Sequence, residues 1–231
     1  MPTVTYYGHS AVQIHDSKHC LLIDPFITGN PRCPIKSSEV RKCDFILVTH
    51  GHGDHIGDTV ALAQRDKATV IATWELAQYF QSKGVTVHPM ACGGGHDFPF
   101  GRVKMTIAFH GCGGDPQGDG TTPPPNTPVG LLIHFGKKLF YHAGDTALFS
   151  DMKLIGEPEK INVAFLPIGD NFTMGVDDAA KAAEFLGAER CIPIHYNTFD
   201  LIKADYKTFQ FKIEKQGKKC TVLKPGEFFD A

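Results

Sequence analysis

The residues from His50 to His55 constrain this chain most, because three histidines and one aspartate occur within the six residues His50-Gly51-His52-Gly53-Asp54-His55. The apolar run 45–48 precedes them, so we expect a strand that ends at His50. Side chains two apart in a strand lie on one side, and glycines let the backbone fold tightly, so His50 and His52 can share one metal ion. Asp54 and His55 can reach a second ion. Imidazole with carboxylate suits zinc, manganese or ferrous iron better than calcium or magnesium.

Composition and charge bound the class of protein. The chain has 231 residues, of which 42% are hydrophobic and 21% charged, which is typical of a soluble domain with a substantial core. No linker rich in Pro, Gly or Ser divides it, so we expect one domain over residues 1–231. A formal net charge of -2 provides no basic field. This disfavours a nucleic-acid partner and favours a small-molecule substrate, while the oligomeric state stays open.

The cysteines and the hydropathy pattern bear on the compartment. The seven cysteines are odd in number, scattered, and never spaced as a Cys-x-x-Cys pair, which fits thiols in a reducing compartment. The first residues carry neither the basic segment nor the apolar segment of a signal peptide. No stretch approaches 18 uncharged apolar residues, the length that a membrane-spanning helix requires. We therefore expect a cytoplasmic protein without a membrane partner.

The first half of the chain combines a β-meander with β-α-β alternation around the motif. Apolar alternation and turn residues give the boundaries of each segment. The predicted strands cover residues 4–7, 11–15, 19–23, 45–49, 69–72 and 85–88, and the predicted helices cover 58–67 and 74–83.

The second half repeats this order. The predicted strands cover 102–109, 129–135, 139–142, 161–168 and 191–194, and the predicted helices cover 177–186 and 201–215. One face of the strand 102–109 is expected to carry Val103, Met105, Ile107 and Phe109. Residues 111–127 form a loop rich in Gly, Asp, Thr and Pro, a length that is usually functional or disordered. Two similar halves predict two sheets packed face to face with helices outside.

Four apolar runs share one ending, a His or Asp followed by glycine or a polar turn. These runs end at or near His50, His110, Asp145 and His195. Residues at strand ends can gather at one edge of a sheet stack, where loops leave room for a ligand. A single histidine at such a place is more often a structural hydrogen-bonding group. Their combination with the six-residue motif favours a metal site over a polar surface loop.

The six-residue motif resembles the HxHxDH signature of the metallo-β-lactamase superfamily, and the later His110, Asp145 and His195 follow in the order that this family uses. Further segments resemble the UPF0173 group of metal-dependent hydrolases, and together they span nearly the whole chain. These segments are Tyr7-Gly8-His9-Ser10, Leu22-Ile23-Asp24-Pro25-Phe26, His142-Ala143-Gly144-Asp145-Thr146, Pro167-Ile168-Gly169-Asp170-Asn171-Phe172-Thr173-Met174-Gly175 and Pro193-Ile194-His195-Tyr196-Asn197-Thr198-Phe199.

This resemblance implies the metallo-β-lactamase fold, a four-layer αββα sandwich of the α/β (α+β) class, with two divalent metal ions. Zinc is the first choice, and manganese, nickel or iron are compatible with the same residues. By motif position, three residues would bind each ion and one aspartate would bridge both. The first set is His50, His52 and His110, the second set is Asp54, His55 and His195, and the bridge is Asp145.

The expected function is that of a binuclear metal-dependent hydrolase. A hydroxide bridged between the two metals would attack an ester, lactone, amide or phosphodiester bond of a small molecule. One alternative is a nuclease or phosphodiesterase acting on nucleic acid, which the low basic charge disfavours. Another is an iron-dependent oxidoreductase on the same fold. Oxygen-reducing relatives resemble HxExDH in this loop, whereas this chain has His52 at that position.

Two residues are candidates for catalysis, Asp54 and His9. His9 lies in the turn Gly8-His9-Ser10, where we expect an exposed side chain that delivers a proton to the leaving group. A turn histidine that only hydrogen-bonds the metal loop is an equal alternative.

Other polar residues near the motifs have expected roles outside the metal set. Asp24 either orients the metal loop or caps a turn. We expect His142 to be structural and Cys112 to be an ordinary thiol. The loop 111–127 directly follows a predicted ligand, so we expect it to set substrate choice.

Overall fold

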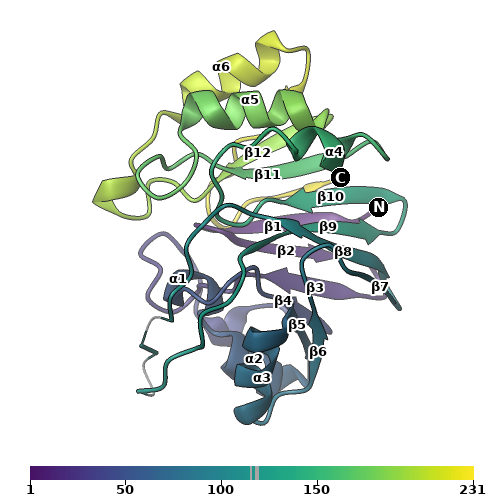
Figure 1. Ribbon diagram of the computed structural model, residues 1–231, viewed down its shortest axis with the longest axis vertical. Coiled ribbons are helices and arrows are strands. Elements are labelled where there is room, and N and C mark those ends of the chain that lie inside the picture. Colours follow the sequence, from purple (N-terminus) through teal and green to yellow (C-terminus); the bar gives the residue numbers. More distant parts are fainter. Residues whose placement is uncertain (115, 118–119) are drawn as a thin grey trace.

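The computed structural model describes residues 1–114, 116, 117 and 120–231, so Asp115, Gly118 and Asp119 of the predicted loop lie outside the described residues. Two seven-stranded β-sheets stack face to face, and helices cover their outer faces (Figure 1). None of the described helices is both long and apolar enough to cross a bilayer.

The first sheet has the strand order β14-β1-β2-β3-β4-β5-β6. Pairing is antiparallel from β14 to β3 and parallel from β3 to β6. Its strands are β1 (Thr3–Gly8), β2 (Ala11–His15), β3 (Cys20–Ile23), β4 (Phe45–Leu47), β5 (Thr69–Thr73), β6 (Val87–Met90) and β14 (Phe228–Asp230).

The second sheet has the order β13-β12-β11-β10-β9-β8-β7. It is parallel from β13 to β10 and antiparallel from β10 to β7, so both sheets follow one plan. Its strands are β7 (Gly95–Phe98), β8 (Gly101–Ile107), β9 (Val129–Phe135), β10 (Lys138–His142), β11 (Val163–Pro167), β12 (Arg190–Ile194) and β13 (Lys219–Cys220). This confirms the expected similarity of the two halves.

Helices form the two outer layers. On the first sheet lie α2 (Thr59–Asp66) and α3 (Trp74–Ser82), and on the second lie α4 (Met152–Gly156), α5 (Val176–Leu186) and α6 (Tyr206–Lys215). A short helix α1 (Gly53–Ile56) lies in the metal motif, and 3-10 turns cover Ser37–Glu39 and Asp200–Ile202.

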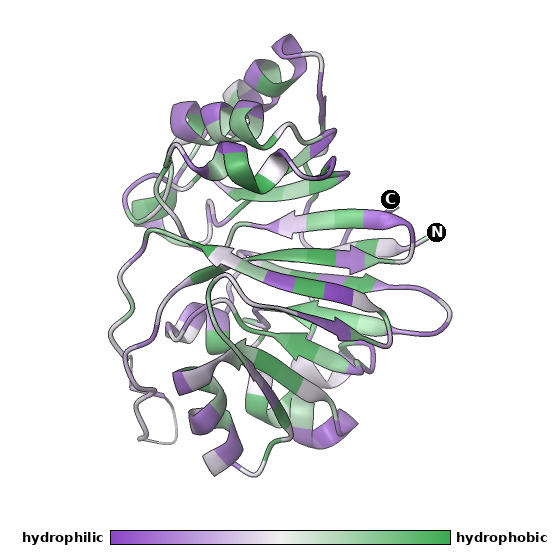
Figure 2. Ribbon diagram, turned by 45° about the vertical axis from the view of Figure 1, so that its right-hand side comes forward, coloured by the Kyte–Doolittle hydropathy of each residue, from purple (hydrophilic) through white to green (hydrophobic). Residues whose placement is uncertain are grey.

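Three hydrophobic clusters separate the four layers. One fills the space between the sheets, and the other two lie between each sheet and its helices. In β4 and just beyond it, Phe45 and Leu47 face the inner cluster while Ile46 and Val48 face the helices. A strand buried on both faces must be apolar at every position, which explains the continuous run. Figure 2 shows hydrophobic residues along the strands and hydrophilic residues on the outer helix surfaces. The αββα sandwich is confirmed.

The strand predicted over 102–109 ends earlier than expected. In β8, Val103, Met105 and Ile107 alternate as predicted, although Ile107 is 40% exposed. Phe109 lies beyond β8 and is 55% exposed, so the predicted shared face is wrong at Phe109. After Ile107 the chain leaves the sheet. The backbone N–H of Phe109 donates to Oγ1 of Thr146 over 3.0 Å, and this bond replaces strand pairing.

The helix predicted over 201–215 begins later, at Tyr206. Asp205 accepts a hydrogen bond from the backbone N–H of Lys207 over 3.0 Å and so caps the helix. The strand predicted over 85–88 is shifted to β6, where the pairing of Val70 with Val87 sets the register. Pairing with a neighbour, rather than local apolar content, determined this boundary.

Candidate metal centre

Four strands deliver the predicted ligands to one edge of the sandwich. His50 follows β4, His110 follows β8, Asp145 follows β10 and His195 follows β12. β10 and β12 belong to the parallel segment of the second sheet, so their carboxyl ends lie at the same edge of that sheet. His50, at the end of β4 in the first sheet, lies close to Asp145 and so joins them at this edge. The chain leaves each strand here, which frees these side chains from the sheet.

The first histidine group contains His50, His52 and His110. Nε2 of His50 lies 3.0 Å from Nδ1 of His52, and Nε2 of His110 lies 3.3 Å from the same nitrogen. All three offer a ring nitrogen within 4.8 Å of one another, so the group could hold a metal ion. These are the three residues that motif position assigned to one ion.

The second group contains Asp54, His55 and His195, and it also contains His9. Nε2 of His195 lies 3.8 Å from Oδ2 of Asp54. Nε2 of His9 lies closer to the same oxygen, at 2.9 Å. The structure therefore brings the three predicted residues together and adds a fourth that sequence reasoning had left outside the group.

Asp145 lies between the two groups. Its Oδ1 is 3.3 Å from Nε2 of His55, and its Oδ2 is 3.1 Å from Nε2 of His195. The same Oδ2 lies 3.6 Å from Nε2 of His110, which belongs to the first group. One carboxylate therefore contacts both groups, the position expected of a bridge.

Buried atoms at the centre suit bound cations. Nε2 of His55 and Oδ1 of Asp145 are fully buried and lie 3.3 Å apart, and neither makes a hydrogen bond of good geometry with any described residue. A buried polar atom without a partner costs about 1–3 kcal/mol, so such atoms are usually satisfied by a ligand or ion. A donor set of imidazole and carboxylate is also the set that zinc and similar ions prefer. The residues present therefore fit a pair of divalent metals.

Asp24 makes hydrogen bonds that orient the metal loop, residues 50–55. Its Oδ2 lies 2.7 Å from Nδ1 of His55 and accepts a hydrogen bond from the hydroxyl of Thr49 over 2.7 Å. The backbone N–H of Thr49 donates to Oδ1 of Asp24 over 2.8 Å. Oγ1 of Thr49 lies 3.0 Å from Nδ1 of His50. Asp24 and Thr49 thus leave Nε2 of both histidines facing the centre, which is how a carboxylate commonly orients metal ligands. Of the two sequence interpretations of Asp24, the structure supports the orienting one.

His9 is buried, which corrects the expectation of an exposed turn residue. Its relative exposure is 1%, because the rings of Phe26 and Phe199 pack against it with centroids 5.6 Å away in both cases. Nδ1 of His9 lies 2.9 Å from Oγ1 of Thr198, and its Nε2 faces Asp54. Both ring nitrogens therefore have partners within the protein.

The electrostatics of the centre favour positive charge near Asp145. Burial lowers the pKa of His55, but Asp145 and Asp24 outweigh it and raise that pKa well above its ordinary value. Burial would raise the pKa of Asp145, but His195 and His55 hold it well below its usual range. Burial lowers the pKa of His50 well below its ordinary value, and His55 adds to this. The two carboxylates thus favour the positive charge that bound metal ions supply.

The backbone is strained at three of these residues. His9, Asp24 and His195 have φ values of 55°, 45° and 52°, in the left-handed region that residues other than glycine seldom adopt. The backbone N–H of His195 donates to the carbonyl of His9 over 2.7 Å and joins two of the strained positions. Such conformations cost of order 1–3 kcal/mol each and cluster at functional sites.

The described part of the loop 111–127 contacts the metal loop and α3. The backbone N–H of Gly51 donates to Sγ of Cys112 over 3.1 Å, so this thiol supports the turn between two predicted ligands. A Cβ at Gly51 would lie 2.5 Å from Nδ2 of Asn126, so any larger residue here would displace the side chain of Asn126. Further along, Oγ1 of Thr121 accepts a hydrogen bond from Nζ of Lys83 over 2.7 Å.

Some residues of the centre were placed by the sequence and others were missed. His142 is structural as predicted, since its Nε2 donates to the carbonyl of Ser10 over 3.0 Å. The sequence alone did not identify Thr49 or Thr198 as residues of the centre. Thr49 directly precedes the six-residue motif, and Thr198 lies in the segment 193–199 that resembles the family. The only signal in the sequence was the position of each threonine within three residues of a predicted ligand. Such threonines are common in proteins without a metal site, so this signal is weak.

The chain is similar to known metal-dependent hydrolases in sequence and in fold. A β-lactamase superfamily domain matches residues 19–196. A UPF0173 metal-dependent hydrolase of Bacillus cereus strain B4264 is 50% identical over 224 residues, which cover 97% of each chain. The solved structure of Igni18, a novel metallo hydrolase from the archaeon Ignicoccus hospitalis, superposes with a TM-score of 0.88 at 34% identity, covering 100% of this chain and 99% of that one.

A more distant structure shares the fold alone. CmlA, a diiron β-hydroxylase from Streptomyces venezuelae, superposes with a TM-score of 0.77 at 13% identity, covering 100% of this chain and 54% of that one. The expected metallo-β-lactamase fold is confirmed by these superpositions. With half of its residues identical to UPF0173 proteins over nearly its whole length, the chain belongs to the UPF0173 group of metal-dependent hydrolases in the β-lactamase superfamily.

Proposed function

We propose that the protein is a binuclear hydrolase that uses two divalent metal ions to cleave an ester, lactone, amide or phosphodiester bond of a small molecule. Zinc is the first choice of metal. The observation that carries this proposal is the pair formed by Nε2 of His55 and Oδ1 of Asp145. Both atoms are buried, lie 3.3 Å apart between two groups of potential ligands, and make no hydrogen bond of good geometry with any described residue.

The proposed ligand sets follow the two groups. His50, His52 and His110 would hold one ion, and Asp54, His55 and His195 would hold the other, with Asp145 shared between them. The short distances from Asp145 to His55, His110 and His195 support this sharing. When bound, such a pair of ions activates water at neutral pH and stabilises negative charge on the attacked oxygen.

The protein supplies orientation and proton transfer. Asp24 and Thr49 fix the rings of His55 and His50, which keeps the metal-facing nitrogens in place without further reorganisation. We assign proton transfer to His9 and Asp54. Burial and His195 lower the pKa of His9 to about 4, so its ring is neutral at pH 7 and its Nε2–H donates to Oδ2 of Asp54. This pair can take up the proton that the attacking water loses and return it to the leaving group, which balances the proton over the reaction.

Three broader assignments accompany the activity. We propose that residues 1–231 form one hydrolase domain, since the inner hydrophobic cluster contains residues of both sheets. A small-molecule substrate fits the net charge of -2 better than nucleic acid does. A cytoplasmic location fits seven cysteines, all of them in the described part of the chain and none in a disulfide.

The test is a hydrolysis assay of the zinc-loaded chain with aryl esters, lactones, amides and a phosphodiester. A His110→Ala variant removes one proposed ligand, and a His134→Ala variant removes a partly exposed histidine on β9 as a matched control. We expect the His110→Ala variant to lose activity by at least about 10²-fold and the control to keep it. Unchanged hydrolysis by the His110→Ala variant would contradict the proposal.

A further inference from the structure

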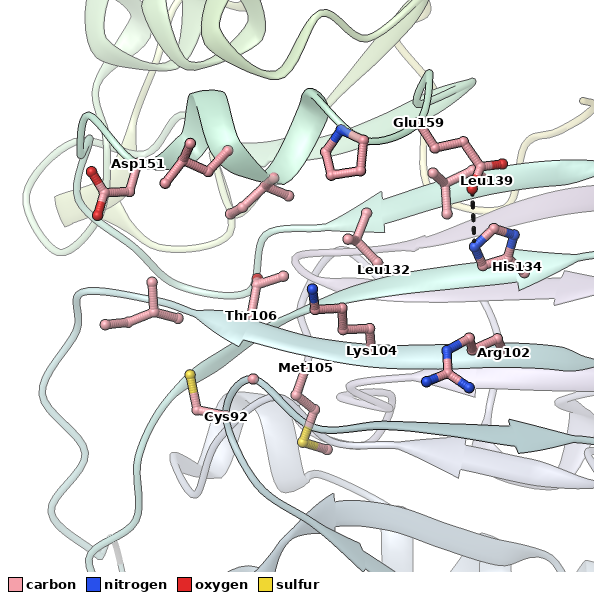
Figure 3. A pocket seen from close by; sticks show the side chains of 15 residues that line it. Cys92, Arg102, Lys104, Met105, Thr106, Leu132, His134, Leu139, Asp151 and Glu159 are labelled. Atoms are coloured by element: carbon pink, nitrogen blue, oxygen red, sulfur yellow. Dashed lines mark ion pairs between the residues drawn. The ribbon is translucent and has the colours of Figure 1, made fainter.

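A cavity of about 420 Å³ lies on the outer face of the second sheet, between the strands β8 and β9 and the helix α4 (Figure 3). Its lining contains none of the residues of the metal centre. Helices α5 and α6 cover β11 and β12, but α4 has only five residues and leaves part of β8 and β9 open. The volume is in the range of about 300–1,000 Å³ that is typical of small-molecule sites.

The floor of this cavity is apolar. Leu132 and Leu139 project from the strands (Figure 3). Leu154 and Ile155 of α4 also line the cavity. Leu154 is 62% exposed and borders the opening. Apolar side chains that remain open to water are stabilised when a ligand covers them, so this floor favours an apolar ligand body.

Of the basic side chains in the cavity lining, Arg102 and His134 have acidic partners, whereas Lys104 has none among the residues that the structure describes. Nη1 of Arg102 lies 2.8 Å from Oδ2 of Asp97, outside the cavity. Nε2 of His134 lies 3.4 Å from Oε2 of Glu159, the pair drawn as a dashed line in Figure 3. Lys104 takes part in no ion pair with any residue that the structure describes.

Lys104 is placed over the apolar floor. It alternates with Arg102 and Thr106 on one face of β8, and Figure 3 shows its ammonium group between Thr106 and Leu132. The carboxylate of Asp151 lies at the far end of the cavity, where it accepts a hydrogen bond from the hydroxyl of Ser150 over 3.0 Å. A ligand anion is therefore favoured at Lys104 and disfavoured at Asp151.

We propose that this cavity binds a small monocarboxylate with an aliphatic or aryl body. The carboxylate pairs with the ammonium group of Lys104, and the body lies over Leu132, Leu139 and Leu154. Charge complementarity selects the anion, and the apolar floor selects against short, fully polar acids.

The test is calorimetric titration of the zinc-loaded full chain with octanoate, beside octylammonium and acetate. We expect saturable binding of octanoate and at least roughly tenfold weaker binding of the other two. A Lys104→Gln variant should bind octanoate about tenfold more weakly, the loss expected for one charge-assisted contact. A Lys137→Gln variant removes an exposed lysine of the neighbouring β9–β10 turn, outside the cavity, and should bind as the unmodified chain does.

Several results would overturn the proposal. Equal binding of octanoate and octylammonium would show that no cation selects the ligand. Equal affinities of the two lysine variants for octanoate would show that Lys104 does not bind the carboxylate. Binding that is lost in the His110→Ala variant but kept in the Lys104→Gln variant would assign the carboxylate to the metal centre. A dimer that a Leu154→Asp variant converts to a monomer would assign this face to a second copy of the chain.

Discussion

Nε2 of His9 lies 2.9 Å from Oδ2 of Asp54, although one residue follows β1 and the other lies in α1 of the metal motif. The contact connects the first turn of the chain to the second group of potential ligands. Burial would raise the pKa of Asp54, but His55 and His9 hold it well below its usual range, so Asp54 stays a carboxylate. His9 can therefore exchange a proton with the charged carboxylate of Asp54.

Replacement of His9 tests this role. We expect a His9→Ala variant to bind both metals and to lose kcat by roughly 10² to 10⁴, the range typical of general acid–base catalysis. The loss should be smaller for substrates with good leaving groups, because these depart without a proton. Steady-state kinetics with a series of aryl esters measures both effects.

Thr198 offers a matched comparison, since its hydroxyl lies 2.9 Å from Nδ1 of His9 and contacts the same ring from the other side. A Thr198→Val variant should show a smaller loss of kcat with the same dependence on leaving group. Loss of metal in the His9→Ala variant, or equal losses for good and poor leaving groups, would assign His9 to structure.

Asp145 should control the occupancy of both sites. Because its oxygens contact His55, His110 and His195, an Asp145→Ala variant is expected to lose the pair of ions rather than one. Elemental analysis of the purified variant measures this, with the exposed Asp200→Ala variant as a control. Metal content that stays at the level of the control would show that Asp145 is not shared.

Metal removal should lower stability. Ions that bind only the folded state stabilise it by about 2.7 kcal/mol at one hundred times their dissociation constant, and chelation removes this contribution. For a chain of this size we expect the Tm to fall by at least about 5 °C. Differential scanning calorimetry before and after verified chelation tests this. Identical melting curves would place the site outside the cooperative fold.

Asp66 should contribute stability that depends on pH. Burial would raise its pKa, but hydrogen bonds from Arg65 and Cys43 lower it below the ordinary value. A lowered folded-state pKa stabilises the fold above the unfolded value of about 3.9, and this stability is lost as pH falls through the folded value. An Asp66→Asn variant should be destabilised by about 1–3 kcal/mol at pH 7.

The difference between the Asp66→Asn variant and the unmodified chain should shrink as the pH falls below about 4. Urea unfolding at several pH values measures it. An Asp16→Asn variant changes a surface carboxylate that also accepts backbone hydrogen bonds and serves as the comparison. A difference for Asp66→Asn that is constant from pH 7 to pH 3 would exclude the charge as its cause.

Periodicity predicted most of the sandwich, because its signal is local. The run 45–48 reads as a strand buried on both faces, and the strands of both sheets recur in the same order. Boundaries were less predictable where a distant partner decides them. Phe109 continued the alternation of β8, but Thr146 and Phe149 take it out of the sheet. The start of α6 depends on the cap at Asp205 rather than on its apolar face.

The sequence predicted which residues form the metal centre, but it did not predict their burial or their hydrogen-bond partners. The motif and the strand ends identified the groups that the structure brings together. The burial of His9 depends on Phe26 and Phe199, which come from two loops far apart in sequence. The partnership of Asp24 with His55 depends in the same way on the packing of β3 beside β4. Such contacts are set by tertiary packing, which no local pattern encodes.

The number of metal ions per chain tests the central claim most directly. The chain is loaded with zinc, separated from unbound metal by gel filtration, and analysed for zinc and protein by mass spectrometry. We predict two ions per chain, one for each group of ligands around Asp145. One ion per chain, or none, would contradict a binuclear centre.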